Sequence, residues 1–299
     1  IKSYDQNEYS YSSINKLVKV DKKSTNRIGI LPLTVDNTTF TYDEKGLRTS
    51  KIYLKMNGYY IDKTEYSYKY IGNKLYEESR HIYFKNVKND STHPYYPEAD
   101  TIDVYKYIYK GEELVGYCVN NENYYYYQKN VFGDIIGIYD SNKQVVAKYK
   151  YDPYGVCSIT YDRYGAGNNN PFRYRGYYYD IETQLFYCNS RYYSPELCRW
   201  ISPDSIEYLD PQSINGLNLY CYCMNNPIMY ADPSGHMPEW LQWTLGGLIA
   251  VVAIGGSIAL SVLAAPALIG ALGGTLAANI AGGAIIGAVG GAVAGFGVS

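Results

Sequence analysis

The sequence predicts a mainly β protein, in which repeated hairpins form a sheet that curls into a solenoid or shell, followed by an apolar Gly/Ala-rich α-helical tail. Three observations support this prediction. The 299 residues include 39 tyrosines against 6 phenylalanines and 3 tryptophans. Tyrosine favours strands because its ring packs on a pleated surface while its hydroxyl stays hydrated or hydrogen-bonded. Tyr-Asp dipeptides recur along the chain. In the stretches between them, tyrosine or apolar residues alternate with polar ones, as in a strand.

Hairpin tips are predicted where Tyr-Asp is followed by glycine. Three copies have the form Tyr-Asp-x-x-Gly, and they begin at Tyr42, Tyr151 and Tyr161. The aspartate can accept a hydrogen bond from the backbone two residues on, and the glycine supplies the positive φ that closes a type I turn with a bulge. We therefore expect each copy to be a hairpin tip.

Strand pairs are predicted between these tips. In the stretch TEYSYKYIGNKLYEES, Tyr66, Tyr68 and Tyr70 fall on one face of a strand and Gly72-Asn73 makes the turn. The same arrangement returns in DIIGIYDSNKQVVAKYKYDPYG. Hairpins that recur at irregular spacings indicate an array in which each unit buries its face against its neighbours.

The chain divides into three regions by composition. Residues 1–170 hold the hairpin repeats, and residues 171–236 form a core region with the densest run of aromatic residues. Residues 237–299 are apolar, and from Trp240 onward they contain no charged residue and no histidine. We expect the abrupt change of composition to mark a boundary between two functional parts.

Composition also excludes several classes of protein. The net charge of −2 gives no electrostatic reason to expect nucleic acid as a partner. No phosphate-binding glycine loop, zinc motif or Ser-His-Asp ordering is present, so we predict no cofactor and no metal. The six cysteines form no CxxC pair and have no histidine at ligand spacing, which favours free or structural thiols. Cys221 and Cys223 are expected on one face of a strand.

Two ordered blocks in the core region carry a family resemblance. They are RYRGYYYDIETQLFYCNSRYYSPELCRWISPD, at Arg173–Asp204, and NLYCYCMNNPIMYADPSGH, at Asn218–His236. This region resembles the core domain that closes Rhs, or YD-repeat, proteins, and the weaker Tyr-Asp repeats cover most of residues 1–170. The resemblance implies a hollow β-shell of hairpins that the core domain plugs at one end.

The resemblance also implies a function. In bacterial members the chain after the core is usually a toxin held inside the shell, so the expected role is to encapsulate and release a C-terminal effector. The implied partners are the chain's own payload, a secretion apparatus, and the membrane or surface glycans of a target cell. The implied location is secreted or on the cell surface. A different possibility is a cell-surface protein that binds carbohydrate or a receptor through exposed tyrosine faces and does not cleave itself.

Some members of the family cut themselves after the core, at a P-x-x-x-x-D-P-x-G-L motif. The segment PIMYADPSGH matches this motif except at its last residue, His236, where leucine is usual. The resemblance carries the catalytic set to Arg191, Asp204 and Asp232, and places the cut between His236 and Met237. It implies an aspartyl-protease-like activity of one turnover.

The residue types suit this chemistry. Two carboxylates held close together do not both ionise, so one can donate a proton while the other activates water. A simpler interpretation stands beside it, because Asp204 follows a proline and Asp232 precedes Pro-Ser-Gly, which are positions that turns require. Arg191 would then be a structural partner of either aspartate.

The tail predicts a helical hairpin. Trp240–Ala265 and Ala267–Gly295 are each long enough to cross a bilayer, which takes about 20 apolar residues, and Pro266 separates them. Trp240 and Trp243 suit a membrane interface. Glycines spaced by four favour close helix–helix contact in membranes, and they stand at Gly283, Gly287, Gly291 and Gly295. We expect the tail to be membrane-active or enclosed in the shell.

Overall fold

A computed structural model describes residues 1–22, 35–56, 60–86, 98–205, 217–232 and 235. These residues form two antiparallel sheets, one of thirteen strands and one of four. The predicted mainly β fold is therefore confirmed, and the predicted helical tail lies outside the described residues.

The larger sheet, called the strip below, pairs each strand with the next strand along the chain. Sequential antiparallel pairing needs only short connections, and this is why a succession of hairpin signals produces one continuous sheet. Its strands are β1 Ser3–Tyr4, β2 Asn7–Tyr11, β3 Leu17–Lys22, β4 Val35–Tyr42, β5 Arg48–Met56, β6 Tyr60–Ile71, β7 Lys74–Asn86, β8 Ala99–Lys110, β9 Glu113–Val119, β10 Asn123–Lys129, β11 Ile135–Asp140, β12 Val145–Tyr151 and β13 Cys157–Asp162.

The smaller sheet, called the core sheet below, also pairs its strands in sequence order. Two short helical elements lie between the strip and the core sheet in the chain, and a third follows the core sheet. These elements are α1 Ala166–Asn169, η1 Tyr174–Gly176, β14 Tyr178–Asp180, β15 Leu185–Cys188, β16 Arg191–Ser194, β17 Arg199–Trp200 and η3 Cys223–Asn225.

Two of the three predicted Tyr-Asp-x-x-Gly tips are confirmed. At the β4–β5 turn, Asp43 Oδ1 accepts the Leu47 N–H at 2.8 Å, and Gly46 has φ of +79°. At the β12–β13 turn, Asp152 Oδ1 accepts two later backbone N–H groups at 2.9 Å, and Gly155 has φ of +94°. The carboxylate and the glycine have the roles that the sequence assigned to them.

The third predicted tip, at Tyr161, is wrong. Here Asp162 ends β13, and the chain turns into helix α1 instead of another strand. Asp162 Oδ1 accepts the Gly167 N–H at 2.7 Å and Oδ2 accepts the Asn168 N–H at 3.1 Å. The physical reason is that a carboxylate suits the free N–H groups of a first helical turn as well as those of a hairpin.

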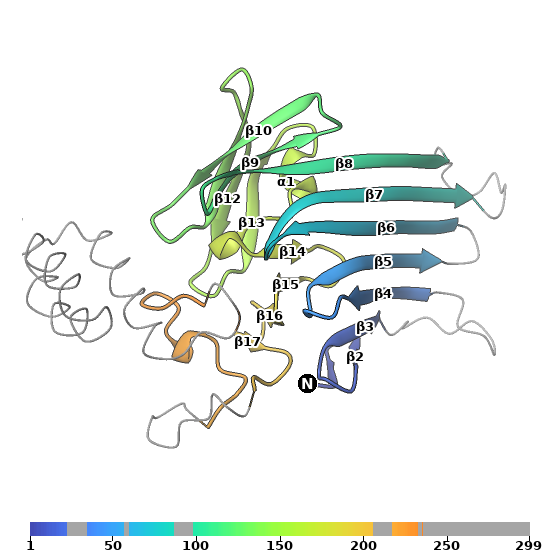
Figure 1. Ribbon diagram of the computed structural model, residues 1–299, viewed down its shortest axis with the longest axis vertical. Coiled ribbons are helices and arrows are strands. Elements are labelled where there is room, and N and C mark those ends of the chain that lie inside the picture. The colour runs from blue at the N-terminus through green and yellow to red at the C-terminus, as the bar shows by residue number, and fades with distance from the viewer. Residues whose placement is uncertain (23–34, 57–59, 87–97, 206–216, 233–234, 236–299) are drawn as a thin grey trace, which may run out of the picture.

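The core sheet lies on the inner side of the bent strip (Figure 1). Tyrosines from the strip and from the core sheet share one buried cluster, which includes Tyr68, Tyr107, Tyr117, Tyr178 and Tyr187. The alternation of strand side chains turns these rings inward. The tyrosine excess therefore supplies a large part of the core, whereas the sequence had suggested faces that stay half-exposed.

The other face of the core sheet builds a second cluster. Phe186 and Cys188 of β15 point into it, together with Tyr193, Trp200 and Tyr222. All four residues of β15 are buried because each of its faces is covered. The core sheet is thus packed between the strip and the loop after β17, so its position is fixed from both sides.

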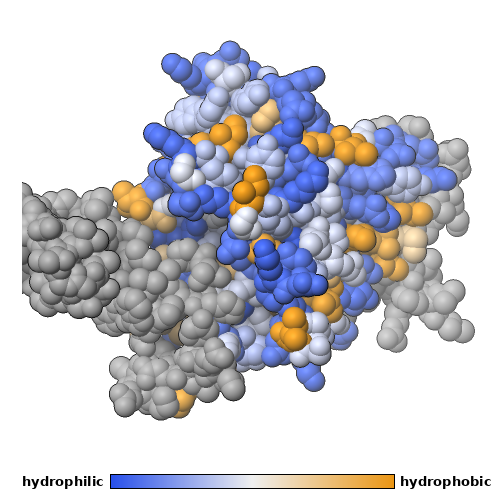
Figure 2. Space-filling view, in the orientation of Figure 1, coloured by the Kyte–Doolittle hydropathy of each residue, from blue (hydrophilic) through white to orange (hydrophobic). Residues whose placement is uncertain are grey.

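On the face that Figure 2 shows, the described surface is mainly hydrophilic and its hydrophobic residues form small separate groups. Exposed large hydrophobic side chains such as Ile14, Ile71 and Tyr164 stand on separate elements. Among the residues described, no helix has the length and apolar character needed to span a bilayer. Both predicted apolar spans belong to residues 236–299, which are outside the description.

The cysteines are unpaired, as expected for free or structural thiols. The expectation that Cys221 and Cys223 share a strand face is wrong, because Cys223 begins the short helix η3. Residues 223–225 all have positive φ, which a strand does not allow. In the described part of the chain no group of His, Cys, Asp or Glu is placed to hold a metal ion.

Candidate functional site

Arg191 is the centre of the predicted site. It begins β16, and pairing of β16 with β17 brings Trp200 beneath it, with 4.1 Å between the guanidinium carbon and the centre of the ring. The side chain is 5% exposed. Burial lowers the pKa of Arg191, whereas the charges of Asp204 and Asp232 raise it. The guanidinium keeps its charge because arginine does not deprotonate in proteins.

Both predicted aspartates reach the same nitrogen of this arginine. Arg191 Nη2 lies 2.8 Å from Asp204 Oδ2 and 3.4 Å from Asp232 Oδ2. Asp204 stands in the loop after β17, and Asp232 stands near the end of the described chain. The fold therefore assembles the three residues that the family motif selected.

Asp232 also makes the turn that its Pro-Ser-Gly context suggested. Its Oδ1 accepts the Gly235 N–H at 2.8 Å, and Gly235 has φ of +75°. A Cβ at Gly235 would lie 2.3 Å from Ser190 Oγ and 2.8 Å from the Cys188 carbonyl oxygen. Only glycine fits this position, since both its conformation and its surroundings exclude a side chain. Asp232 thus combines the turn role and a place in the carboxylate cluster.

The chain just before the predicted cut is held by Arg191. Its Nε donates to the Gly235 carbonyl oxygen, and its Nη1 donates to the Leu219 carbonyl oxygen at 3.3 Å. The Asp204 backbone N–H donates to the same Leu219 oxygen at 3.0 Å. His236 and Met237, the predicted cleavage residues, lie outside the described residues.

Tyr177 is a member of this site that sequence reasoning missed. Its hydroxyl donates to the Asp232 carbonyl oxygen at 2.7 Å and lies 3.4 Å from the Tyr222 hydroxyl. Burial raises the pKa of the neighbouring Cys188 thiol, and the charge of Asp232 raises it further, so this thiol stays protonated. Tyr177 stands in the YRGYYYD block, but one tyrosine among three gave no signal of its own.

A second buried polar cluster joins the strip to the core sheet, and the sequence did not reveal it. Lys51 Nζ on β5 lies 2.9 Å from Asp180 Oδ1 and 2.8 Å from Glu182 Oε2. Arg48 Nη1 contacts Asp180 Oδ2, and the Tyr66 hydroxyl donates to Glu182 Oε1 at 2.6 Å. The side chains of Arg48, Lys51 and Asp180 are at most 2% exposed. Such a network ties the two sheets together in one register.

The comparisons with known proteins agree with this architecture. A model of the Teneurin YD-shell family matches residues 2–228. The tRNA nuclease WapA of Bacillus subtilis is 33% identical over 254 residues, which is 82% of this chain and 9% of that protein. The toxin subunit YenC1 of Yersinia entomophaga is 25% identical over 217 residues, 69% of this chain and 20% of YenC1.

A shorter match and a solved structure extend the comparison. The toxin protein Tse5 of Pseudomonas aeruginosa is 36% identical over 86 residues, 28% of this chain and 6% of Tse5. A crystal structure of TcdB2–TccC3 has a TM-score of 0.59 at 24% identity, covering 77% of this chain and 10% of that one. This likeness concerns the fold alone.

The chain thus spans only a small part of the relatives that it matches, between 6% and 20% of the three named here. The family match nevertheless runs through the strip and the core sheet, and it includes Arg191 and Asp204. The chain belongs to the teneurin- and Rhs-type YD-shell family.

Proposed function

We propose that this chain is the last part of a YD-shell that encloses a payload on the same polypeptide, and that residues 171–236 close the shell where the payload begins. The observation that carries the proposal is the fixed exit of the chain. Gly235 is locked against Ser190 and Arg191 on a core sheet that lies on the inner side of the bent strip. The relatives support it, because WapA, YenC1 and Tse5 are named as a nuclease, a toxin subunit and a toxin protein.

A container needs a rigid anchor where its contents begin. The second buried network, from Arg48 to Glu182, supplies such an anchor by fixing the core sheet to the strip. The exit residue is held in turn by Asp232 and Arg191. The payload chain therefore starts from a defined point of the shell and not from a free end.

Enclosure is tested by protease protection. In the longest natural polypeptide that contains this sequence, residues 237–299 should resist protease while the fold is intact and be cut once urea unfolds it. A tail that is cut in the native protein as fast as a free peptide of the same sequence would contradict enclosure.

We also propose that the core region cuts the chain once, between His236 and Met237. Asp204 is the more exposed carboxylate, 12% against 2% for Asp232, so it is the one that water reaches and it acts as the base. Asp232 acts as the acid after it takes up a proton, because two neighbouring carboxylates do not readily both ionise. Arg191 anchors the Gly235 carbonyl one residue before the cut.

The reaction balances with water alone. The water oxygen bonds to the His236 carbonyl carbon while Asp204 takes its proton, and Asp232 gives a proton as the bond to the Met237 nitrogen breaks. The products are a carboxyl group on residue 236 and an amine on residue 237. Because site and substrate share one chain, little binding entropy remains to be lost.

Intact-mass analysis tests this reaction. We expect the wild-type chain to split after residue 236, and D204N and D232N to stay whole. The D152N variant, which alters a turn aspartate outside the site, should split like the wild type. A new carboxyl end at Gly235 would move the cut to the carbonyl that Arg191 holds. A wild-type chain that stays whole would refute the proposed cleavage, and the proposed container role would not be affected.

For the tail we propose membrane insertion after release, in line with its uncharged sequence from Trp240 to Ser299. Dye release from anionic and neutral vesicles should rise when the tail is freed from the shell by unfolding. Vesicles that stay sealed in the presence of the freed tail would contradict it. Release to act on other cells fits a secreted or surface location.

The inner tyrosine face of the strip does not support carbohydrate binding. Several inner-face tyrosines of the strip, such as Tyr68, Tyr107 and Tyr117, are 6% exposed or less. A ring that is buried in this way is not available to stack on a sugar.

A further inference from the structure

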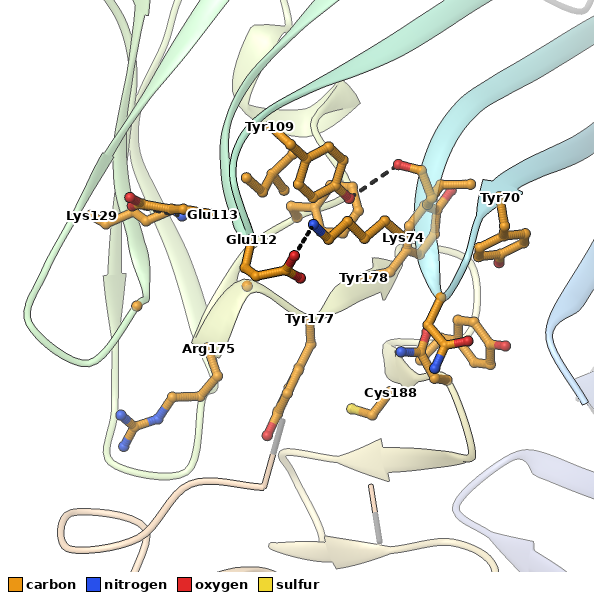
Figure 3. A pocket seen from close by; sticks show the side chains of 18 residues that line it. Tyr70, Lys74, Tyr109, Glu112, Glu113, Lys129, Arg175, Tyr177, Tyr178 and Cys188 are labelled. Atoms are coloured by element: carbon orange, nitrogen blue, oxygen red, sulfur yellow. Dashed lines mark hydrogen bonds and ion pairs between the residues drawn. The ribbon is translucent and has the colours of Figure 1, made fainter. Parts of the chain in front are cut away.

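The segment from Pro227 to Asp232, called the motif segment below, is held at both ends by one short stretch of the core region. Arg175 Nη2 donates to the Pro227 carbonyl oxygen, and the Tyr177 hydroxyl donates to the Asp232 carbonyl oxygen at 2.7 Å. In Figure 3, the side chains of Arg175 and Tyr177 both extend from the ribbon toward the bottom of the view. Two residues of the RYRGYYYD block therefore support the first and the last residue of the P-x-x-x-x-D motif.

The motif segment is closed into a turn of its own. The Asn226 carbonyl oxygen accepts the N–H of Met229 at 3.2 Å and the N–H of Tyr230 at 3.1 Å. Tyr230 is 7% exposed and Asp232 is 1% exposed. A turn that is closed by hydrogen bonds and packed in this way moves as one unit, so a support at Pro227 also acts on the position of Asp232.

Arg175 is fixed in turn by the strip. Its backbone N–H donates to Asp134 Oδ1 at 2.8 Å, and its Nη1 donates to the Phe132 carbonyl oxygen at 3.2 Å. Both acceptors belong to the turn between β10 and β11. The guanidinium carbon lies 4.7 Å from the centre of the Phe132 ring, and the Arg175 side chain is 6% exposed. One buried arginine thus connects a turn of the strip to the motif segment.

The backbone of Arg175 indicates that its side chain is needed at this position. Arg175 has φ of +53°, in the left-handed region that a long side chain seldom adopts. A glycine would take this conformation without strain, as Gly176 does with φ of +70°. Strain of this kind persists where the contacts of the residue outweigh it, and it is concentrated at functional sites.

A second turn of the strip supports the residues just before the motif segment. The Tyr154 hydroxyl, in the β12–β13 turn, donates to the Asn225 carbonyl oxygen at 3.0 Å. The Tyr154 carbonyl oxygen accepts the Tyr193 hydroxyl at 2.7 Å, and Tyr193 stands on β16 together with Arg191. This turn therefore links the strand that carries Arg191 to the chain that leads to Asp232.

We propose that Arg175 is a positioning residue for the self-cleavage, which holds the motif segment at Pro227 and thereby places the Asp232 carboxylate beside Arg191. The inference deepens the proposed cleavage and rests on it. Because the β10–β11 turn fixes Arg175, the site is complete only when the strip is seated against the core region. Cleavage then follows the assembly of the strip on the core and does not precede it.

Cutting rates of Arg175 variants test the positioning role. Intact-mass time courses compare the wild type with R175M and R175K. Methionine fills similar space but donates no hydrogen bond, so R175M should cut about tenfold more slowly or less. Lysine can still donate to one carbonyl oxygen, so R175K should recover part of the rate. The control R163M, at an exposed arginine over the Tyr164 ring, should cut like the wild type. An R175M chain that cuts at the wild-type rate would overturn the proposal.

Hydrogen exchange gives a measurement that does not depend on cutting. It is made in the full chain with D204N as background, which is expected to stay whole. Adding R175M should speed exchange of the Met229 and Tyr230 amides about tenfold, because their turn loses its support. The Lys143 amide, which donates to the Asp140 carbonyl oxygen in a distant turn, should keep its rate. Unchanged exchange at Met229 and Tyr230, or equally faster exchange at Lys143, would count against a local hold by Arg175.

The failures of the two proposals can be told apart. If the wild-type chain stays whole, the cleavage fails and the positioning role fails with it. If the wild type splits and R175M splits as fast, the cleavage stands and only the role of Arg175 fails, even where exchange at Met229 is faster. Slower cutting by R175M, partial recovery by R175K and faster exchange confined to the motif segment together support the proposal.

Discussion

The strip and the core sheet use the same dipeptide in opposite ways. At the β12–β13 tip, Asp152 of one Tyr-Asp pair is exposed and its carboxylate accepts backbone N–H groups of its own turn. In β14, Asp180 of another pair is fully buried and its carboxylate meets Arg48 and Lys51 from the strip. A local motif therefore makes a self-contained turn in one region and a long-range joint in the other.

This difference shows where the stability of the assembly is concentrated. A tip that satisfies its own polar groups can be repeated or lost with little effect on its neighbours. A buried ion pair across two sheets depends on every partner, because each one left alone is a charge out of water. We therefore expect a substitution in the buried ion pair to lower the free energy of unfolding much more than a substitution at a tip.

The largest effect is expected from D180N. The change leaves Arg48 and Lys51 buried with one negative charge fewer, which costs about 3–5 kcal/mol in the free energy of unfolding. Urea unfolding followed by circular dichroism measures it. The matched change D152N, at an exposed tip, should cost less than about 1 kcal/mol. Equal costs for the two variants would mean that the two aspartates do not differ as described.

The second largest effect is expected from acid, which should weaken the buried network between the strip and the core sheet. Burial acts to raise the pKa of Glu182, but Lys51 and the Tyr66 hydroxyl outweigh it and lower this pKa to about 2. Since the folded pKa lies below the unfolded one, the stability is present above about pH 4.5 and is lost as pH falls toward 2. The full contribution is roughly 3 kcal/mol.

Unfolding measured against pH checks this expectation. In the wild type, the free energy of unfolding should fall between pH 4.5 and pH 2, and E182Q should lose the part of the slope that Glu182 supplies. The variant E112Q, whose side chain is 92% exposed, should keep the wild-type slope. If E182Q has the same dependence of unfolding free energy on pH as the wild type, Glu182 does not contribute to the buried network in the way described.

Glycines at two hairpin tips allow a further comparison, between a tip that contacts the core region and a tip that contacts nothing. Gly155 has φ of +94°, and a Cβ there would lie 2.6 Å from the Tyr174 ring of the core region. Gly72 has φ of +61° and nothing within 4 Å. G155A should cost about 3 kcal/mol from strain and overlap together, and G72A about 1 kcal/mol from strain alone. Thermal unfolding of both variants measures the difference, and equal shifts in Tm would contradict it.

A smaller effect than that of G155A is expected from Y177F. Removing the hydroxyl leaves the Asp232 carbonyl oxygen without this donor, at a cost of about 1–2 kcal/mol. The proposed self-cleavage should also slow, because Asp232 is then less firmly placed. Rates from intact-mass time courses and unfolding curves measure the two effects separately. The strip variant Y126F, at an exposed ring, should change neither, and a Y177F chain that cuts at the wild-type rate would exclude a positioning role.

Much of the strip was predictable because its signals are local. Asp43 and Asp152 bond to residues within four positions, so the sequence around each tip contains all the atoms that make it. The same argument failed at Asp162, where the local pattern was right but the next element was a helix. A turn motif states how the backbone bends, and packing decides which element the bend leads into.

The core was predictable only in part. Arg191, Asp204 and Asp232 were found through the family motif, and the structure brings them together. The contact between Tyr177 and Asp232 was not found, since a single tyrosine in a tyrosine-rich chain carries no distinguishing pattern. The joint of Arg48 and Lys51 with Asp180 was missed for another reason, because its partners are about 130 positions apart.

The sequence by itself determined the β class, the turn chemistry of the strip, and the boundary at which charges end, because each depends on neighbouring residues. The tertiary structure alone decided which face of the tyrosine strands is buried, which aspartates pair with cations, and where the chain leaves the core. These properties arise when distant strands meet, and burial then turns an ordinary Asp180 or Gly235 into a residue that the fold cannot replace.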